Sequence, residues 1–387
     1  MAGLAGFGKM LRLFWQSENV DAENTGPEAI TKSWEGDFPI LSAAWAPTTD
    51  NSCLFSLASF YEQSENFIRV VQQKGKGEFS EICEPVDHEY PVTDSTWHGG
   101  GIGGLKLICG GQKGITFYGL REISKTNSKK QNRPYSHEWT QEYSHELTQE
   151  YAIDQDFDGK LPVTGLDCCT KNQNRLFTTC ASQLLSIFDV NVGKRTSSFR
   201  LGDMEGMANI TIKSAPTNSE YSCAVGRQDG SMRLFKAGEK NQVVEILKKQ
   251  GNPVVRLSWS EHNSNLLAAL HLHAHKPIVI DVRNPSSPLD WKEGVYGSHD
   301  GFMSDIAWSN SKRNSLCTAW TDKDVHAKNW IGKILTWECD KKGNFSSDVP
   351  LEHPWDDEPC SRIMFNPNKG GDMAVVTNGS LHVFHQP

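Results

Sequence analysis

A short segment that recurs seven times is the feature of this sequence that most restricts its fold. The segment reads Pro, apolar, two variable residues, apolar, one variable residue and Trp, with substitutions in some copies. The copies begin at Pro39, Pro91, Pro162, Ala208, Pro253, Phe302 and Pro359, at intervals of 52, 71, 46, 45, 49 and 57 residues. Two more strand-like runs follow each copy, and a unit this small cannot bury its faces alone. The chain must therefore stack seven similar units against one another.

The unit that starts at Pro253 shows how the strands are expected to pack. Val255, Leu257 and Trp259 alternate with polar residues, which is the period of a strand that buries one face. Residues 278–280 are apolar without interruption, as in a strand that is covered on both faces.

The intervals indicate an all-β fold, because most of them lie close to the ~40–45 residues of a four-stranded propeller blade. We predict one seven-bladed β-propeller over residues 29–387, preceded by an extension over residues 1–28. The chain stops three strands into the seventh unit. The run from Ile30 to Trp34 is the natural fourth strand, and its pairing with the hairpin from Met373 to Phe384 would close the ring without an open edge.

Two insertions interrupt the repeat, at about residues 121–160 in the second blade and 323–332 in a hairpin of the sixth. The first holds an octad written twice, Ser136-His-Glu-Trp-Thr-Gln-Glu-Tyr143 and Ser144-His-Glu-Leu-Thr-Gln-Glu-Tyr151. One interpretation is a duplication within a mobile loop. The alternative is a helix, because Trp139, Tyr143, Leu147 and Tyr151 stand four residues apart and would share one face.

Composition narrows the functional classes. Lys and Arg number 39 against 47 Asp and Glu, a net charge of -8, which disfavours a general nucleic-acid-binding surface. The 10 Cys are scattered, mostly in strand-like runs, and form no Cys-x-x-Cys pair. We therefore expect reduced core thiols and a location in the cytoplasm, the nucleus or both. No apolar run reaches the ~18 residues of a membrane span.

The first 28 residues differ from the repeats. Phe14 and Trp15 are adjacent, and the apolar residues around them recur at helical spacing. One interpretation is a segment that folds onto a partner protein or a membrane surface through Phe14 and Trp15. The alternative is a loose tail, or a strand that covers part of its own domain. Lys9 and Arg12 interrupt the apolar stretch, which disfavours a secretory signal.

The repeat resembles that of the WD-repeat superfamily, with Phe188-Asp189, Ile280-Asp281 and Trp337-Glu338 in place of its Trp-Asp dipeptide. The resemblance implies a structural hydrogen-bond network in blade six, formed by His299, Thr318, Asp322 and Trp337. Such a network ties the loop between two blades to the inner strands through buried polar groups that satisfy one another.

Several segments, which occur in the same order along the chain, narrow the resemblance to one family within this superfamily. They are Pro39-Ile-Leu-Ser-Ala-Ala-Trp45, Asp87-His-Glu-Tyr-Pro-Val-Thr93, Asp229-Gly-Ser-Met-Arg-Leu-Phe235, Pro253-Val-Val-Arg-Leu-Ser-Trp259 and Val279-Ile-Asp-Val-Arg-Asn-Pro285. In these the chain is similar to an adaptor family that includes a plant anthocyanin and trichome regulator and an animal protein that binds DYRK-type kinases and associates with cullin ubiquitin ligases. The resemblance implies a scaffold for a kinase, a transcription factor or a cullin-ligase adaptor.

Residues 280–283 match a short box through which some WD-repeat proteins dock on the adaptor of a cullin ligase, with Ile280 in place of its Trp. By this resemblance Asp281 and Arg283 are candidate partner-binding residues. The alternative is that the two side chains only pair with neighbouring strand ends on the surface.

No arrangement of residues in the sequence predicts a catalytic centre. His271, His273 and His275 fall in an expected hairpin turn, without a nearby Cys or carboxylate to complete a metal site. Residues 99–104 are Gly-rich but lead into a strand, whereas a phosphate loop precedes a helix. We therefore expect no enzymatic activity, no metal and no cofactor.

Function should then lie on the faces of the disc, because a propeller offers a rigid rim and two faces with variable loops. The first hypothesis is a non-catalytic scaffold or adaptor for protein–protein interaction. The alternative is a structural subunit of a large fixed assembly, such as a nuclear pore, a coat or a ciliary complex, with residues 1–28 as its anchor.

Overall fold

The fold is taken from a computed structural model of the chain. The structure describes residues 32–48, 52–61, 65–75, 77–101, 104–123, 143–154, 161–172, 174–201, 208–238, 240–289, 302–323, 330–339, 345–346, 355–356, 359–368 and 371–384. Phe14, Trp15, the rest of the extension over residues 1–28 and His299 lie outside the described residues. No helix that could span a membrane occurs in the described part of the chain.

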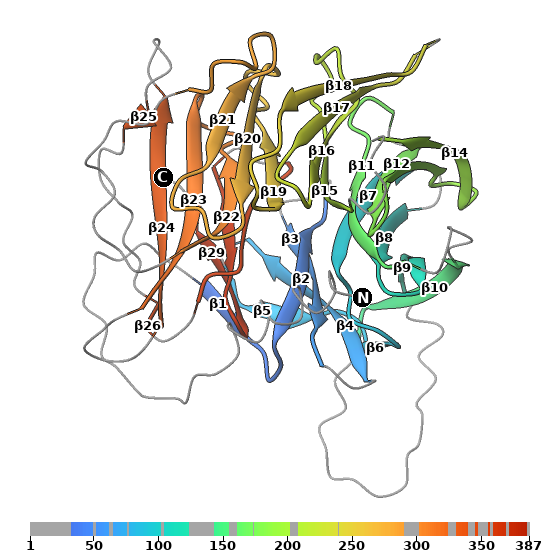
Figure 1. Cartoon of the computed structure of the whole chain (residues 1–387). Coiled ribbons are helices and arrows are strands. Elements are labelled where there is room, and N and C mark those ends of the chain that lie inside the picture. The colour runs from blue at the N-terminus through green and yellow to red at the C-terminus, as the bar shows by residue number, and fades with distance from the viewer. Residues whose placement is uncertain are drawn as a thin grey trace, which may run out of the picture.

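The described strands form seven antiparallel sheets, which are numbered here as blades (Figure 1). Blade 1 contains β2 (Ile40–Trp45), β3 (Ser52–Ser59), β4 (Asn66–Lys74), β5 (Phe79–Glu81) and β6 (Val86–His88). Blade 2 contains β7 (Asp94–Gly101), β8 (Gly104–Gly110), β9 (Gly114–Glu122) and β10 (His145–Asp154). Blade 3 contains β11 (Val163–Cys168), β12 (Arg175–Cys180), β13 (Leu184–Asp189) and β14 (Lys194–Arg200).

The remaining four blades follow in the same way. Blade 4 contains β15 (Asn209–Ser214), β16 (Cys223–Arg227), β17 (Met232–Lys236) and β18 (Gln242–Leu247), and blade 5 contains β19 (Val254–Trp259), β20 (Leu266–His271) and β21 (Ile278–Asp281). Blade 6 contains β22 (Phe302–Trp308), β23 (Ser315–Lys323), β24 (Trp330–Cys339), β25 (Phe345–Ser346) and β26 (Trp355–Asp356). Blade 7 contains β27 (Arg362–Phe365), β28 (Met373–Val376), β29 (Ser380–Phe384) and β1 (Lys32–Glu35).

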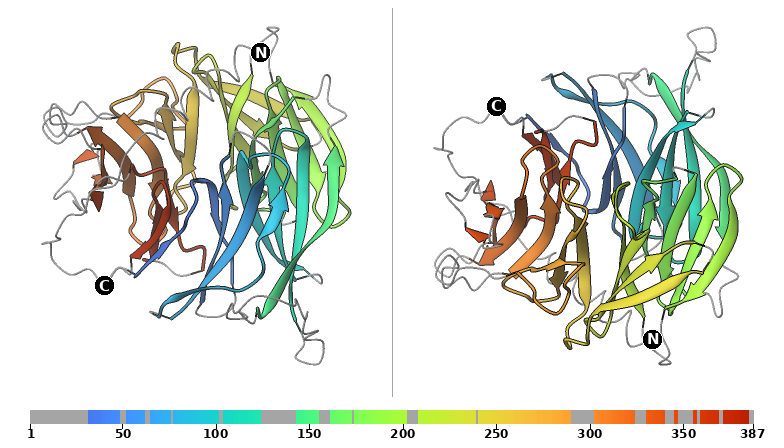
Figure 2. Two further views of the ribbon diagram at one scale, coloured as in Figure 1. Left: turned by 90° about the horizontal axis from the view of Figure 1, so that it is seen from below. Right: turned by 90° about the horizontal axis from the view of Figure 1, so that it is seen from above.

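The inner strands of the blades close into a ring. They contact one another in the order β2, β7, β11, β15, β19, β22 and β27, and β27 contacts β2. Figure 2 shows the same succession, because the colours pass from one sheet to the next until blue strands meet red ones. The predicted seven-bladed β-propeller is confirmed.

The hydrophobic core lies between the blades. Within the described residues it divides into seven clusters, one at each junction between adjacent blades. The cluster between blades 6 and 7, for example, joins Ile334 to Ile363 and Val375. Since each sheet is covered on both faces, β3 and β20 are buried along their whole length. Val279 and Ile280 are fully buried and Ile278 is half-buried, so the predicted burial of the apolar run in β21 holds for two of its three residues.

The N-terminal strand closes the ring as predicted. β1 pairs antiparallel with β29, with Trp34 opposite Leu381 (Figure 1). The main chain continues the pairing, because Gly36 N donates to Gly379 O at 2.8 Å. Trp34 is buried and lies edge-on to Phe38, with 5.8 Å between ring centroids. The described strand begins at Lys32, so Ile30 lies outside the described residues.

A β-bulge recurs at one position of the inner strands, between the second and fourth residues of the repeated segment. It occurs at Ile40/Ser42, Val163/Gly165, Asn209/Thr211, Val254/Arg256 and Met303/Asp305. The extra residue breaks the alternation of faces. In β19, Val254 is fully buried and Val255 only half-buried. The predicted burial of Val255 on the same face as Leu257 and Trp259 is therefore wrong.

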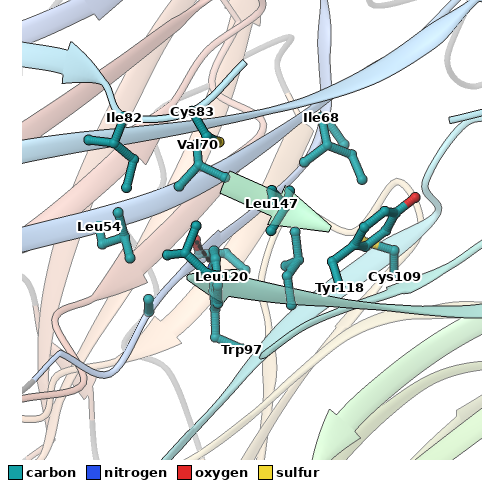
Figure 3. Packing of buried hydrophobic residues seen from close by; sticks show 14 of the residues in the cluster. Leu54, Ile68, Val70, Ile82, Cys83, Trp97, Cys109, Tyr118, Leu120 and Leu147 are labelled. Carbon is teal, nitrogen blue, oxygen red and sulfur yellow. Dashed lines mark hydrogen bonds between the residues drawn. The ribbon is translucent and has the colours of Figure 1, made fainter. Parts of the chain in front are cut away.

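The second octad forms the outer strand of blade 2. β10 pairs with β9 from His145↔Glu122 to Asp154↔Gly114. Leu147 points into the core between blades 1 and 2, near Leu120 (Figure 3). Tyr151 stacks on Phe117, with 4.4 Å between ring centroids. The helix and the mobile loop are therefore both wrong for this copy, while residues 136–142 of the first copy lie outside the described residues.

Two other segments named in the sequence analysis belong to hairpins. β23 and β24 pair as far as Lys323↔Trp330, within the segment expected to lengthen this hairpin. The Gly-rich residues 99–104 join β7 to β8, and Gly101 pairs with Gly104.

The cysteines are core residues. None of the 10 is in a disulfide bond; eight are buried and two, Cys168 and Cys339, are half-buried. Burial raises the pKa of Cys317 to about 11, so this thiol stays protonated near neutral pH. These side chains act as small apolar groups in the core.

Candidate functional site

The end of β21 carries an ordered polar corner on the surface of blade 5. Ile280 and Val282 are buried, so Asp281 and Arg283, which alternate with them, lie on the outer side of the chain. Asp281 Oδ1 accepts the Arg283 main-chain N–H at 3.0 Å. Val282 N donates to Asn265 O of the neighbouring hairpin at 2.8 Å. The corner is therefore held by one bond to the Asp281 side chain and one bond between main-chain groups.

The two side chains form a bidentate ion pair. Arg283 Nε lies 2.9 Å from Asp281 Oδ1, and Arg283 Nη2 lies 2.5 Å from Asp281 Oδ2. The hydrogen bonds from Arg283 lower the pKa of the Asp281 carboxyl, and the same bonds raise the pKa of Arg283. An exposed pair of this kind adds little to folding stability. Its main effect is to hold the guanidinium in one orientation.

The guanidinium remains available to another molecule. The Arg283 side chain is 64% exposed, compared with 22% for Asp281. A guanidinium has five N–H donors, and Asp281 uses one on Nε and one on Nη2. No other partner of Arg283 occurs in the described part of the chain. An oriented donor fork of this type suits a carboxylate or a pair of carbonyl groups on a partner protein.

Blade 3 has the same corner without the arginine. Asp189 ends β13 as Asp281 ends β21, and its Oδ1 accepts Asn191 N at 2.8 Å. The buried Val190 donates its N–H to Asn174 O at 2.8 Å. The turn is thus a recurrent structural element, and the cation at Arg283 distinguishes blade 5. The structure also shows that Asp281 and Arg283 pair with each other and not with neighbouring strand ends.

Of the network predicted in blade 6, the structure describes the part formed by Thr318 and Trp337. Trp337 Nε1 donates to Thr318 Oγ1 at 2.9 Å, and Trp320 Nε1 donates to the same oxygen at 2.9 Å. Thr318 Oγ1 in turn donates to Leu335 O at 3.4 Å. His299 and the Asp322 side chain lie outside the described part of the structure. Sequence reasoning missed Trp320, although it lies two residues after Thr318 and therefore on the same face of β23.

The three histidines of blade 5 do not all lie in the hairpin turn. His271 belongs to β20 and not to the hairpin turn, which corrects the expectation. It is 5% exposed, and its Nε2 lies 3.1 Å from Gly230 O of blade 4, so Nε2 carries the proton. Burial lowers the pKa of His271. Among the described residues, no three His, Cys, Asp or Glu side chains are grouped as a metal site requires.

Charged residues on the inner strands were also missed. At the fourth position of the repeated segment they are Asp94, Arg256, Asp305 and Arg362, and at the sixth position Asp167 and Lys213. Each carboxylate accepts a main-chain N–H from the next blade, namely Leu166 for Asp94 at 3.1 Å, Ser214 for Asp167 at 2.8 Å and Ile363 for Asp305 at 2.7 Å.

The same carboxylates form ion pairs around the ring axis. Lys213 Nζ lies 3.2 Å from Asp167 Oδ2, Arg256 Nε lies 3.3 Å from Asp305 Oδ1, and Arg362 Nη1 lies 3.4 Å from Asp94 Oδ1. Negative and positive groups therefore balance one another near the axis. Aligning the seven copies of the repeated segment would have revealed these residues, because the charged side chains occur at only its fourth and sixth positions.

The chain is similar to known WD-repeat proteins, although no family model matches it. It is 20% identical over 335 residues to a Dictyostelium discoideum protein named DDB1- and CUL4-associated factor 7 homolog, which covers 83% of this chain and 87% of that protein. It is 21% identical over 312 residues to a Saccharomyces cerevisiae WD repeat-containing protein, which covers 76% of this chain and 56% of that protein. The chain thus spans little more than half of the second relative. The seven blades and both similarities support a WD-repeat propeller with a protein-interaction role.

Proposed function

We propose that this protein is a non-catalytic adaptor that attaches a client protein to a cullin-type ubiquitin ligase, with Asp281 and Arg283 as its contact to the ligase. The exposed, oriented guanidinium of Arg283 is the observation that carries the proposal. The name of the Dictyostelium relative points to the same class of ligase. A propeller suits the role because its surfaces are ordered before binding, which reduces the entropy cost of association.

The client is proposed to be a kinase or a transcription factor, on the basis of the sequence resemblance described above. Phe14 and Trp15 in the extension are the proposed second contact, since two adjacent aromatic residues are common anchors in protein interfaces. His299, Thr318, Asp322 and Trp337 are proposed to act structurally and not in binding. The assembly would work in the cytoplasm, the nucleus or both.

Substitution of Arg283 tests the ligase contact. We expect Arg283→Ala to weaken binding to a purified DDB1-type ligase adaptor by about tenfold or more, because truncating an interfacial charged group commonly costs 2 kcal/mol or more. Arg283→Lys should bind at an intermediate level, since an ammonium group cannot reproduce the bidentate fork. Binding is measured by isothermal titration calorimetry with the full-length chain.

Asn191→Ala is the matched control, because Asn191 occupies the place of Arg283 in the corresponding corner of blade 3. It should bind like the unmodified protein. Both variants should unfold at nearly the same denaturant concentration as the unmodified chain, since exposed substitutions usually change stability by less than about 0.5 kcal/mol. Equal binding by Arg283→Ala and the unmodified chain would contradict the proposed contact.

A further inference from the structure

β18 is the outer strand of blade 4 (Figure 1) and carries two adjacent exposed valines. Val243 is 40% exposed and Val244 is 39% exposed. The other exposed large hydrophobic residues in the described part of the chain are Tyr61, Ile123 and Val192, and no two of these are neighbours in sequence. Isolated apolar residues on a surface are ordinary. An apolar pair on an edge strand is different, because the edge also offers main-chain N–H and C=O groups to another strand.

Other outer strands carry features that protect an edge from pairing. β14 begins with Lys194 and Arg195 and ends with Arg200, and charged residues of this kind discourage strand addition. β5, β6, β25 and β26 are only two or three residues long. The one charged residue of β18 is Glu245, and its Oε2 lies 3.3 Å from Arg233 Nη2 on β17. The stretch from Gln242 to Val244 therefore has no such protection.

The exposed part of β18 is regular and anchored. It pairs with β17 in continuous register from Lys236↔Gln242 to Arg233↔Glu245, and the only bulge follows this stretch. Ile246, within β18, is buried. Beyond the strand, Gly251 N donates to Asp229 O at 3.1 Å. The edge is thus ordered without a partner, which lowers the entropy cost of adding a strand.

The charges at the ends of β18 indicate what kind of segment fits. Lys248 and Lys249 follow the strand and Lys240 precedes it, and all three are exposed. No ion pair of these lysines occurs among the described residues. Two copies of β18 paired antiparallel would bring Lys240 of one copy near Lys248 and Lys249 of the other, and like charges at short distance repel. An acidic partner is therefore favoured over a second copy of this chain.

We propose that residues 242–245 bind an extended segment of a partner protein as an additional antiparallel strand. The segment would place apolar side chains beside Val243 and Val244 and acidic side chains beside Lys248 and Lys249. In such strand addition, main-chain hydrogen bonds supply affinity and alternate side chains supply specificity. The site lies on blade 4, apart from the Arg283 corner on blade 5, and does not depend on the proposed ligase contact.

The test uses a fluorescein-labelled peptide, Asp-Asp-Thr-Val-Val-Thr-Thr, and the full-length protein. Fluorescence anisotropy should show saturable binding. A second peptide, with Lys-Lys in place of Asp-Asp, should bind at least tenfold more weakly, because its lysines would lie beside Lys248 and Lys249 and repel them. A peptide with Pro in place of the first two Thr should also bind at least tenfold more weakly, because Pro lacks the N–H that the ladder needs.

Protein variants separate β18 from other exposed apolar residues. Val243→Asn combined with Val244→Asn should lose at least tenfold in affinity for the acidic peptide, because this variant removes the apolar contacts and leaves the charge of the edge unchanged. Val192→Asn is the matched control, because Val192 is 62% exposed but lies in a turn, and it should bind normally. Lys248→Glu combined with Lys249→Glu should reverse the preference between the acidic and Lys-Lys peptides.

Three results would overturn the proposal. One is the absence of binding by the acidic peptide up to about 1 mM, where even a weak complex of ~4 kcal/mol is detected. Another is equal binding by the Pro peptide, which would exclude strand addition. The third is self-association of the chain that the Val243→Asn, Val244→Asn variant abolishes, because the occupant would then be a second copy.

Discussion

The Thr318 hydroxyl group joins two indole rings in the core of blade 6. It accepts N–H bonds from Trp320 and Trp337 and donates to Leu335 O, so its donor and both acceptor sites are used. Thr318 itself has no exposed surface. A buried hydroxyl group with all of its bonds made stabilises one arrangement of the surrounding side chains, whereas a buried donor left without an acceptor is costly.

Thr318→Val should therefore destabilise the protein although it preserves the shape of the side chain. The two indole N–H groups lose a shared acceptor, and we expect a loss of about 1–3 kcal/mol in the free energy of unfolding. Thr318→Ser keeps the hydroxyl group and should lose less. Urea unfolding followed by tryptophan fluorescence measures both variants. If Val and Ser are equally stable, the hydroxyl group is not what holds the two indoles.

The duplicated octad consists of two segments that are nearly identical in sequence, of which the second forms part of β10. The copies differ at one position, where the first has Trp139 and the second has Leu147. Leu147 is 5% exposed and packs in the cluster between blades 1 and 2 (Figure 3). Glu150 pairs with Lys106 at 2.9 Å, and Tyr151 donates its hydroxyl proton to Val190 O of blade 3. The first copy could offer the same Glu and Tyr, so the size of the core residue favours the second.

Leu147→Trp places the residue of the first copy into this cluster and tests that explanation. Extra volume in a packed core commonly costs about 1–3 kcal/mol, and we expect a loss of this size in the free energy of unfolding. Leu147→Met, which has similar volume, should cost less than about 1.5 kcal/mol. Both are measured by urea unfolding of the full chain. A Leu147→Trp variant as stable as the Met variant would show that the cluster has room for the larger ring.

At the scale of the whole molecule, the ring depends on one short strand. β1 comes from near the start of the chain and completes the sheet made by β27, β28 and β29. Trp34 and Leu381 lie in the cluster between blades 7 and 1. Without β1, the edge of β29 would be open and this cluster would lose part of its cover, which favours aggregation.

Two truncations separate the strand from the extension before it. Removal of residues 1–28 should leave the unfolding midpoint nearly unchanged, because β1 begins at Lys32. Removal of residues 1–35 should lower the stability by at least the ~3–5 kcal/mol that loss of a buried Trp costs. Thermal unfolding by circular dichroism and gel filtration measure stability and aggregation. Equal stability of the two truncations would contradict a structural role for β1.

The number of blades, the inner strands and the closing strand were predictable because each depends on a local pattern that repeats along the chain. A strand that is buried on one or both faces carries that information in its own residues, as the run at Val279 and Ile280 shows. The seven repeated units then required stacking. In this respect the sequence by itself determined the architecture.

Features that depend on contacts between different strands were decided only by the tertiary structure. The bulge beside Val255 depends on the pairing of β19 with β20, and the burial of Leu147 depends on packing against residues of blade 1. The pairing of Asp281 with Arg283 requires the turn that Asn265 holds in place. Local periodicity contains no information about these partners, because their free energy comes from packing and hydrogen bonding between strands of one blade or between two blades.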